Sequence, residues 1–346
     1  MKRLPIYILL AALFCSCEYN FELDESSLEN KLYVNCVAGC GDTTFVTVQR
    51  CVPVNKATLA DKKLPDLEYL HLTLDGKDLP LKHMDDTIYN RWYTLEKMNA
   101  GSVLSIRAKA SDTEEVNASC SLPPTPSIKS IKTDFCKTDE SYLEFQIELE
   151  GTTEGYYAVE GQFRTQESAV YDPDYNPYES SDFEGDYITS YYGLYSNILP
   201  ESSEILSERT EEYPGLSWDG RSLNGTIWSS EIKHLSLVSE RDLAESKGIL
   251  RFYIYYNPDC DEDAEYDIYD GGKVKYHHKR VTTRQFRIYR ISPEFYYYAS
   301  AQIAQDENTL GEIGLAPSAF SYTNIDGGFG VLASCAWCET PWMDNI

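Results

Sequence analysis

The 346-residue chain has few of the residues and motifs that usually carry catalysis or nucleic-acid binding. It has only five histidines, and it lacks a serine-hydrolase elbow, a His-Glu-x-x-His helix and a phosphate-cradling glycine loop. Basic residues are also scarce, because 30 Lys and Arg stand against 56 Asp and Glu, giving a formal net charge of −26. The electrostatic field of so negative a protein repels nucleic acid. The sequence therefore predicts no nucleic-acid partner and no enzyme, with a hydrolase built from distant residues as a residual alternative.

A membrane-spanning apolar segment is missing as well. The apolar run Leu4 to Phe14 follows a basic start and is about half of the roughly 20 residues that a spanning helix needs. The small residue Ser16 then precedes Cys17. This order predicts a lipoprotein signal peptide over residues 1–16, cut before Cys17, whose thiol takes the lipid that contacts the membrane. An ordinary cleaved signal with a stray cysteine is the alternative.

The segment 17–30 predicts an acidic tether. Its acids, close behind Cys17, resemble the export tag of Bacteroidota lipoproteins that reach the outer leaflet of the outer membrane. We therefore expect an outer-membrane, lipid-anchored protein that faces the exterior. A solvated linker without an export role is the alternative, because charged polar segments stay disordered in any case.

Eight further cysteines lie beyond the anchor, and an even number in an exported chain indicates disulfides. Three of them lie on adjacent predicted strands, where a local bridge is expected. Cys335-Ala-Trp-Cys338 has the spacing of a redox motif but lies at the end of the chain, so a structural bridge or free thiols are favoured over zinc binding or redox catalysis. The candidate disulfide residues are Cys36, Cys40, Cys51, Cys335 and Cys338.

Strand-like alternation dominates the first half of the mature chain. Segments 31–36 and 43–50 surround a glycine-containing turn, and segment 67–74 runs into Asp75-Gly76, a strong hairpin signal. Two more strands are expected at 89–95 and 103–108. The Pro-rich segment 122–126 then removes backbone donors and predicts a linker. Residues 31–122 are therefore predicted to form an N-terminal β-sandwich.

The alternation restarts after the prolines and predicts a second β-sandwich over residues 127–346. Long insertions are expected at 166–215 and 257–279, because these polar stretches exceed normal loops. Ser292-Pro293 has helix-start chemistry and predicts a short helix from Phe295 to Ala304. A closing strand is expected at 328–333. The predicted fold is thus mainly β, with two antiparallel sandwich domains (immunoglobulin-like or transthyretin-like) and a short C-terminal helix.

The first insertion is rich in tyrosine. Tyrosine offers a large rigid contact area with a polar tip, which suits recognition of a protein or a glycan. Packing of some of these rings on the sandwich is the alternative. The candidate ligand contacts are Tyr171, Tyr175, Tyr178, Tyr187, Tyr191 and Tyr192.

The second insertion is rich in carboxylates. Calcium prefers several carboxylate oxygens, and Asp259, Asp261 and Asp263 could supply them. An EF-hand would need glycine and a bidentate glutamate where this chain has Ala264 and Asp270, so that motif fails. A solvated acidic loop is favoured, with a calcium site of another kind as the alternative and no other cofactor expected.

The C-terminal third carries a family resemblance. Residues 288–298, Pro317 and 322–331 look like the C-terminal signature of a Bacteroidota lipoprotein family catalogued as domain of unknown function 4249. Segment 218–225 and the two predicted N-terminal hairpins are also similar to that family. The extra cysteines and the tail from Cys335 depart from the pattern. From the residues alone, the glycines of 324–330 predict a core-closing corner flanked by Tyr322 and Phe329 rather than a ligand loop.

The resemblance implies a function. Members of that family are often encoded beside TonB-dependent outer-membrane receptors, and no reaction is established for them. We therefore expect a surface lipoprotein that acts as a binding or assembly accessory of such a receptor. The alternative is a lipoprotein that binds glycans or peptides without a receptor.

Overall fold

The fold is mainly β, as predicted. The computed structural model describes residues 31–39, 41–51, 64–84, 90–135, 142–151, 154–171, 183–184, 188–192, 236–255, 264–270, 272–306 and 322–343. Within them, one sheet has eleven strands, and two smaller antiparallel sheets have four and three. The path through the large sheet is β12-β11-β17-β18-β1-β2-β6-β5, with β13 and β14 paired to β11 and β16 paired to β17.

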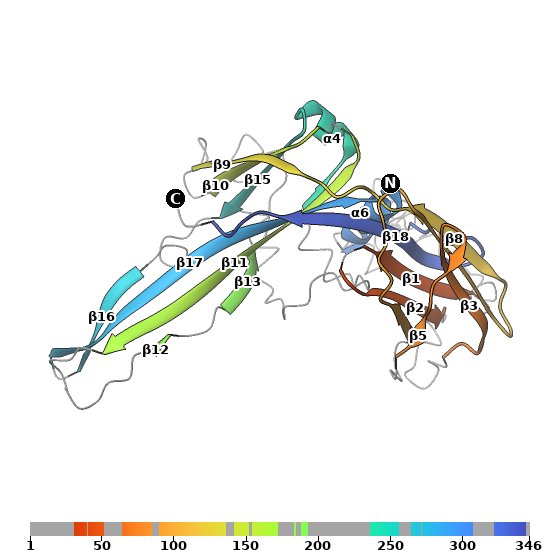
Figure 1. The fold of residues 1–346 in the computed structure, drawn as a ribbon, viewed down its shortest axis with the longest axis horizontal. Coiled ribbons are helices and arrows are strands. Elements are labelled where there is room, and N and C mark those ends of the chain that lie inside the picture. The colour runs from red at the N-terminus through yellow and green to blue at the C-terminus, as the bar shows by residue number, and fades with distance from the viewer. Residues whose placement is uncertain are drawn as a thin grey trace, which may run out of the picture.

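The N-terminal part is a sandwich of two layers (Figure 1). One layer is the end of the large sheet: β1 (Leu32–Ala38), β2 (Thr44–Arg50), β6 (Arg91–Thr94) and β5 (Lys82–His83). The other is the four-stranded sheet: β4 (Lys77–Asp78), β3 (Leu67–Leu74), β7 (Val103–Ala110) and β8 (Val116–Ser121). Alternate residues of β7, including Leu104 and Ile106, are buried in the shared core with Val34 and Leu72. The alternation of apolar residues that predicted this sandwich therefore marks its inner face.

The C-terminal strand β18 (Phe329–Glu339) joins the two halves of the chain. It pairs in parallel with β1 and antiparallel with β17 (Lys273–Ile291). The large sheet thus crosses the boundary predicted at residues 122–127, and a strand from the end of the chain completes the N-terminal layer. The prediction of a strand ending at Ala333 was too short, because β18 continues for six more residues.

The glycines of 324–330 form the predicted close approach. A Cβ on Gly330 would lie 1.9 Å from the Val34 carbonyl oxygen, and one on Gly328 would lie 2.6 Å from that of Leu32. The Asn324 side chain donates to the Leu332 carbonyl (2.8 Å) and accepts from its N–H (3.0 Å). The corner therefore docks β18 against the backbone of the first sandwich.

A three-stranded sheet covers the β11–β17 part of the large sheet. Its strands are β15 (Ile249–Tyr255), β10 (Tyr142–Leu149) and β9 (Ile128–Phe135), and the short helix α4 (Glu240–Glu245) adds Leu243 to the core. Three buried rings form the centre of this core: Phe286 lies 4.6 Å from Phe145 and 4.8 Å from Phe252, between ring centroids. The strands β9, β10 and β15 of this sheet are labelled in Figure 1.

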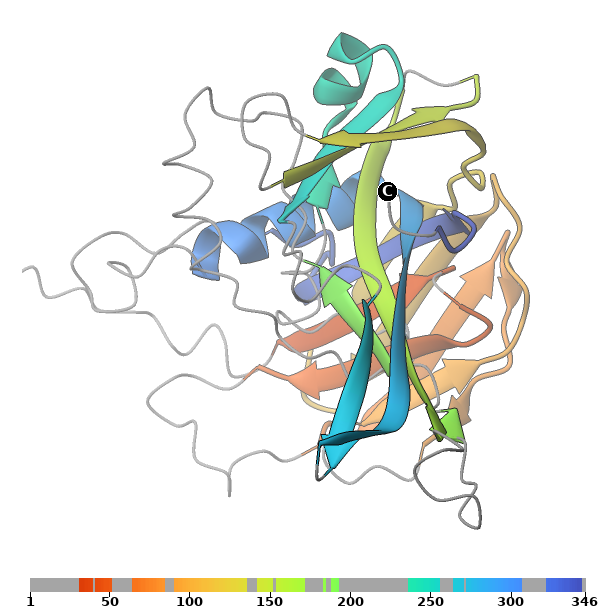
Figure 2. The same cartoon turned by 90° about the vertical axis from the view of Figure 1, so that its left-hand side faces the viewer.

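Helix α6 (Pro293–Asp306) lies against the opposite face (Figure 2). The predicted start is confirmed, because the Phe295 N–H donates to the Ser292 hydroxyl at 3.4 Å. Phe295, Tyr298 and Ala299 are buried with Val37 and Val331. In the part of the chain that the structure describes, no helix is long and apolar enough to cross a membrane.

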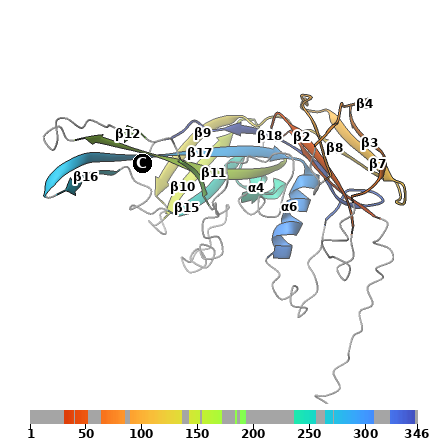
Figure 3. The same cartoon turned by 90° about the horizontal axis from the view of Figure 1, so that it is seen from below.

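A long β-ribbon projects from this body (Figures 1 and 3). β11 (Tyr156–Tyr171) pairs along its whole length with β17, from Tyr156↔Ile291 to Tyr171↔Tyr276. β16 (Ala264–Asp270) pairs with the outer part of β17, and β12 (Phe183–Glu184) and β13 (Ile188–Tyr192) pair with β11. β14 (Ser236–Val238) pairs with the base of β11. Parts of both predicted insertions are therefore strands. We call residues 166–171, 264–270 and 273–281 the arm.

Candidate functional site

The arm presents side chains away from the packed cores. Val170 and Tyr269 are 51% and 62% exposed and are among the few large apolar residues that the described surface leaves open. Val170 pairs with His277, which pairs in turn with Asp267, so these three residues lie in one row across the ribbon. These side chains are accessible to a partner, although single exposed apolar residues are common on protein surfaces.

Ion pairs across the strands stiffen the arm. Lys279 Nζ lies 3.1 Å from Glu265 Oε1, and His277 Nδ1 lies 2.7 Å from Asp267 Oδ1. These pairs are exposed, so each contributes little to stability. They do, however, join basic residues of β17 to acidic residues of β16. The sequence interpretation of a solvated acidic loop missed strand β16, because residues 264–270 belong to the acidic run and pair with the basic residues of β17.

A second exposed feature is a cluster of four tyrosines at the base of β11 and on α6: Tyr156, Tyr296, Tyr297 and Tyr322. The Tyr156 ring lies 4.5 Å from Tyr296 and 5.7 Å from Tyr297, and Tyr297 lies 5.7 Å from Tyr322. The Tyr156 and Tyr297 hydroxyls are 3.0 Å apart and hydrogen-bonded. Tyr297 is 46% exposed. We call these residues the tyrosine cluster.

The three consecutive tyrosines of α6, residues 296–298, have different environments. Tyr298 is buried and its hydroxyl bonds to that of Tyr33 at 3.0 Å, which fixes α6 on β1. Tyr297 points outward instead. The partner Tyr156 lies 141 positions away, so no local pattern in the sequence could have revealed the cluster.

Ionisable groups are also buried in the middle of the large sheet. Glu160 is 1% exposed; it accepts a hydrogen bond from the Tyr289 hydroxyl at 3.1 Å and lies 3.9 Å from Arg287 Nη1. Arg287 also donates to Glu339 at 2.5 Å. Burial raises the pKa of Glu160 above its usual range, and the nearby Arg287 charge opposes this shift only in part. Because this cluster is enclosed between strands, it has the properties of a structural polar network.

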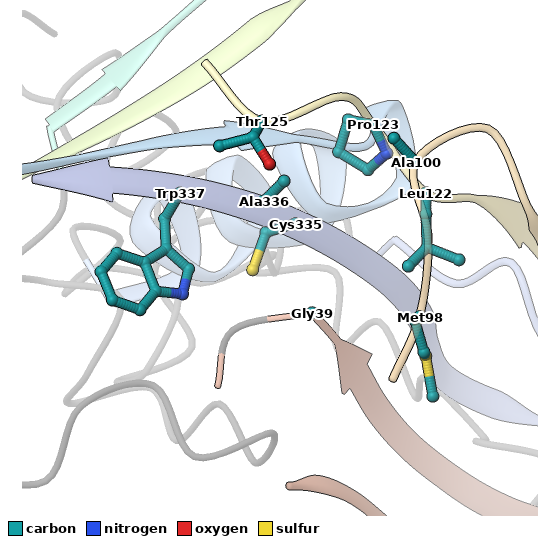
Figure 4. Close-up of a pocket in the computed structure, with 9 residues that line it drawn as sticks. All are labelled: Gly39, Met98, Ala100, Leu122, Pro123, Thr125, Cys335, Ala336 and Trp337. Carbon is teal, nitrogen blue, oxygen red and sulfur yellow. The ribbon is translucent and has the colours of Figure 1, made fainter. Parts of the chain in front are cut away.

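One described cavity lies where β1, the 98–100 turn, the 122–125 linker and β18 meet (Figure 4). Its volume is about 170 Å³, below the roughly 300 Å³ at which small-molecule pockets begin. Gly39, Cys335 and Trp337 are among its lining residues. The cavity is thus too small to hold a drug-sized ligand.

Of the three cysteines for which a local bridge was expected, Cys36, Cys40 and Cys51, two are free thiols, Cys36 and Cys51, so neither takes part in such a bridge. Cys36 pairs with Val46 in the β1–β2 ladder, whereas Cys51 follows the opposite end of β2, beyond the reach of a disulfide. Burial raises the pKa of both Cys36 and Cys51.

Cys335 and Cys338 do not bridge each other either. They lie three residues apart on β18 and face opposite sides of the sheet: Cys335 joins the core under α6, and Cys338 packs against that of the three-stranded sheet. Cys338 is free, and burial raises its pKa to about 11. Cys335 is disulfide-bonded to a residue outside the described ranges.

Several other predicted site residues lie outside the described part of the chain. They are Cys17, Cys40, Tyr175, Tyr178, Tyr187, Asp259, Asp261 and Asp263. Of Tyr171, Tyr191 and Tyr192 the backbone is described, and it lies in β11 and β13. Within the described ranges, no group of three or more His, Cys, Asp or Glu side chains could hold a metal ion.

Fold and surface together define a class: an elongated β-sheet protein with a projecting ribbon and an exposed aromatic cluster, and with a small cavity in its described part. Residues 17–340 match the family described as domain of unknown function DUF4249, and the chain belongs to that family. The match covers most of the chain, including β18 and the tyrosine cluster. No match was found among curated proteins.

Proposed function

We propose that this chain is an outer-membrane lipoprotein, anchored through Cys17 and facing the exterior, that acts as a binding or assembly accessory of a TonB-dependent receptor. Three observations support the proposal: the lipoprotein-type start of the sequence, the family resemblance, and the arm. The arm is the strongest of these observations, because it projects from the body of the protein and exposes apolar side chains to a partner.

The arm suits a large partner better than a small ligand. A protein interface needs about 800 Å² on each side, which an extended ribbon with two open faces can supply. The exposed Val170 and Tyr269 supply apolar contact, and the surrounding ion pairs supply a polar rim. The cavity at the β1–β18 junction, at about 170 Å³, offers no comparable site for a small molecule.

Co-purification of the lipidated protein from detergent-solubilised outer membranes tests the proposal. We expect a TonB-dependent receptor to co-purify with the wild type and to be lost from a Val170→Glu/Tyr269→Glu double variant. Leu95→Glu is the matched control, because Leu95 is 58% exposed on the first sandwich. Absence of a receptor from the wild-type sample, or equal loss with the Leu95 control, would remove the proposal.

The tyrosine cluster favours a second candidate function, a lipoprotein that binds glycans or peptides without a receptor. Exposed tyrosines are common contacts for both ligand classes. Under this alternative the purified lipoprotein binds a polysaccharide or peptide with no receptor present, and the arm variants bind as tightly as the wild type.

We also propose that Cys40 is the disulfide partner of Cys335. Gly39 precedes Cys40 and touches Cys335, since a Cβ on Gly39 would lie 2.0 Å from the Cys335 carbonyl oxygen. The preceding residues Ala38 and Ser334 are partners in the β1–β18 pair. Exported proteins meet thiol oxidants that accept the two electrons and two protons of such a bond.

A further inference from the structure

The tyrosine cluster differs from an ordinary packed core because one of its rings stays open. Tyr297 contacts three other rings, Tyr156, Tyr296 and Tyr322, yet remains 46% exposed. Its hydroxyl is held by that of Tyr156 at 3.0 Å, which fixes the orientation of the ring. A fixed aromatic surface is therefore presented to solvent between α6 and the start of β11.

Carboxylates surround this surface. Glu294 lies one helical turn before Tyr297 on α6, so the two side chains share a face. Glu240 accepts a hydrogen bond from the Gly155 N–H at 3.4 Å, which places it beside Tyr156. The hydrogen bond with Tyr297 and burial raise the pKa of Tyr156 to about 12, with a smaller contribution from Glu240. Burial raises the pKa of Tyr322, and the Glu294 charge adds to this shift.

One basic residue lies close to this surface. Arg290 pairs with Tyr157 and lies 5.9 Å from the centroid of that ring, and its guanidinium also lies beside Gly155, where a Cβ would be 3.2 Å from Arg290 Nε. Its charge therefore offsets that of Glu240 in part. One Glu294 oxygen, Oε2, is shielded from solvent and has no hydrogen-bond partner among the described residues. The cluster thus combines ring faces, which carry partial negative charge, with the incompletely neutralised carboxylate of Glu294.

We infer that the tyrosine cluster binds a cationic side chain, lysine or arginine, of a partner protein, with the cation over the Tyr297 ring and its charge balanced by Glu294 and Glu240. The inference rests on the proposed accessory function and assigns a second contact to the same partner. Cations favour aromatic faces, and the chain's net charge of −26 attracts basic segments and repels anionic ones. A neutral sugar could donate hydrogen bonds to these carboxylates but would not balance their charge.

A titration with two matched peptides tests the inference. The probe is the blocked peptide Gly-Arg-Gly-Arg-Gly, and its control replaces each arginine with citrulline, which has nearly the same shape and no charge. The full mature protein carries ¹³C-labelled tyrosine rings, and the Tyr297 signal is assigned by its loss in Tyr297→Phe. We expect the arginine peptide to shift the Tyr297 signal, and the citrulline peptide to leave it in place.

Three variants separate the contributions. Tyr297→Phe keeps an aromatic face and should bind nearly as well as the wild type, whereas Tyr297→Leu should bind about 2- to 30-fold more weakly. Glu294→Gln keeps the shape, removes the charge and should also weaken binding. Equal binding of both peptides, no shift of Tyr297, or unchanged binding by Tyr297→Leu and Glu294→Gln would overturn the inference.

The co-purification experiment distinguishes failure of the proposed cation site from failure of the proposed accessory function. If the receptor co-purifies equally with wild type and Tyr297→Leu, the cation site is wrong and the accessory function stands. If no receptor co-purifies with the wild type while the arginine peptide still binds at Tyr297, the accessory function is wrong and the cation preference of the cluster stands. A shift of Tyr297 by an uncharged oligosaccharide and by neither peptide would replace the inference with the glycan-binding alternative.

Discussion

Replacing Gly330 with alanine tests the join between β1 and β18. Gly330 has a φ of +105°, which L side chains rarely adopt, and its Cβ would lie 1.9 Å from the Val34 carbonyl oxygen and 2.8 Å from the carbonyl carbon. Both obstacles are backbone atoms of a paired strand, so no side-chain movement relieves the contact. The chain must therefore separate β18 from β1 at this point.

The expected magnitude has two parts. The left-handed conformation costs about 1–2 kcal/mol for any residue with a Cβ. The steric contact lowers the stability further, because it disrupts pairing between β1 and β18. Val34 and Gly330 lie within a parallel ladder of six residue pairs, and each hydrogen bond lost from it costs about 0.5–1.5 kcal/mol. We expect a loss of more than about 4 kcal/mol, which is exceptional for one substitution. Gly76→Ala is the matched control: its φ is +76°, nothing lies within 4 Å, and only the first part applies.

Urea unfolding of the mature protein, followed by far-ultraviolet circular dichroism and tryptophan fluorescence, measures both losses. A Gly330→Ala variant that loses no more stability than Gly76→Ala would refute the β1–β18 junction as described.

Other predictions address the interior. Phe286→Ala should cost about 3–5 kcal/mol in urea unfolding, because the ring is buried between Phe145 and Phe252. The raised pKa of Glu160 means that the folded state holds its proton more tightly, so the stability this provides is complete below the ordinary glutamate range and is lost as pH rises through the raised value. Glu160→Gln should flatten the decline of Tm with rising pH. A dependence of Tm on pH equal to that of the wild type would argue against the raised pKa of Glu160. Non-reducing peptide mapping should find Cys335 joined to Cys40.

The sequence was informative where one face of a strand is buried. Period-2 alternation placed β1, β2, β3 and β7 correctly, and the Ser292-Pro293 pair placed the start of α6. It did not predict the outer half of β17, because residues 273–281 are mostly basic and half-buried, so no apolar face marks them as a strand. The short helix α4 was also missed, although Ser239 and Asp242 form a capping box that is visible in the sequence.

The candidate sites were less accessible from the sequence. The predicted tyrosine contacts drew on local density in 171–192, whereas the tyrosine cluster combines β11, α6 and Tyr322 from three distant segments. The cysteine interpretation failed for a related reason. Proximity along the chain suggested a bridge among Cys36, Cys40 and Cys51, but Cys36 and Cys51 are free, and the β1–β2 register sets them at different heights in the ladder. Register and long-range pairing carry this information, and spacing along the chain does not.

The position of β18 also bears on when this protein acquires its shape. Val34 and Gly330 are partners although about 300 residues separate them, so a growing chain makes β1 long before its neighbour exists. Closing so large a loop is slow, because its entropy is lost before the contacts form. Until the C-terminal segment has been synthesised, the edge of β1 that pairs with β18 is unpaired, and the N-terminal sandwich cannot complete its folding. For the export that we propose, such a delay keeps the new polypeptide unfolded enough to pass through a translocation channel.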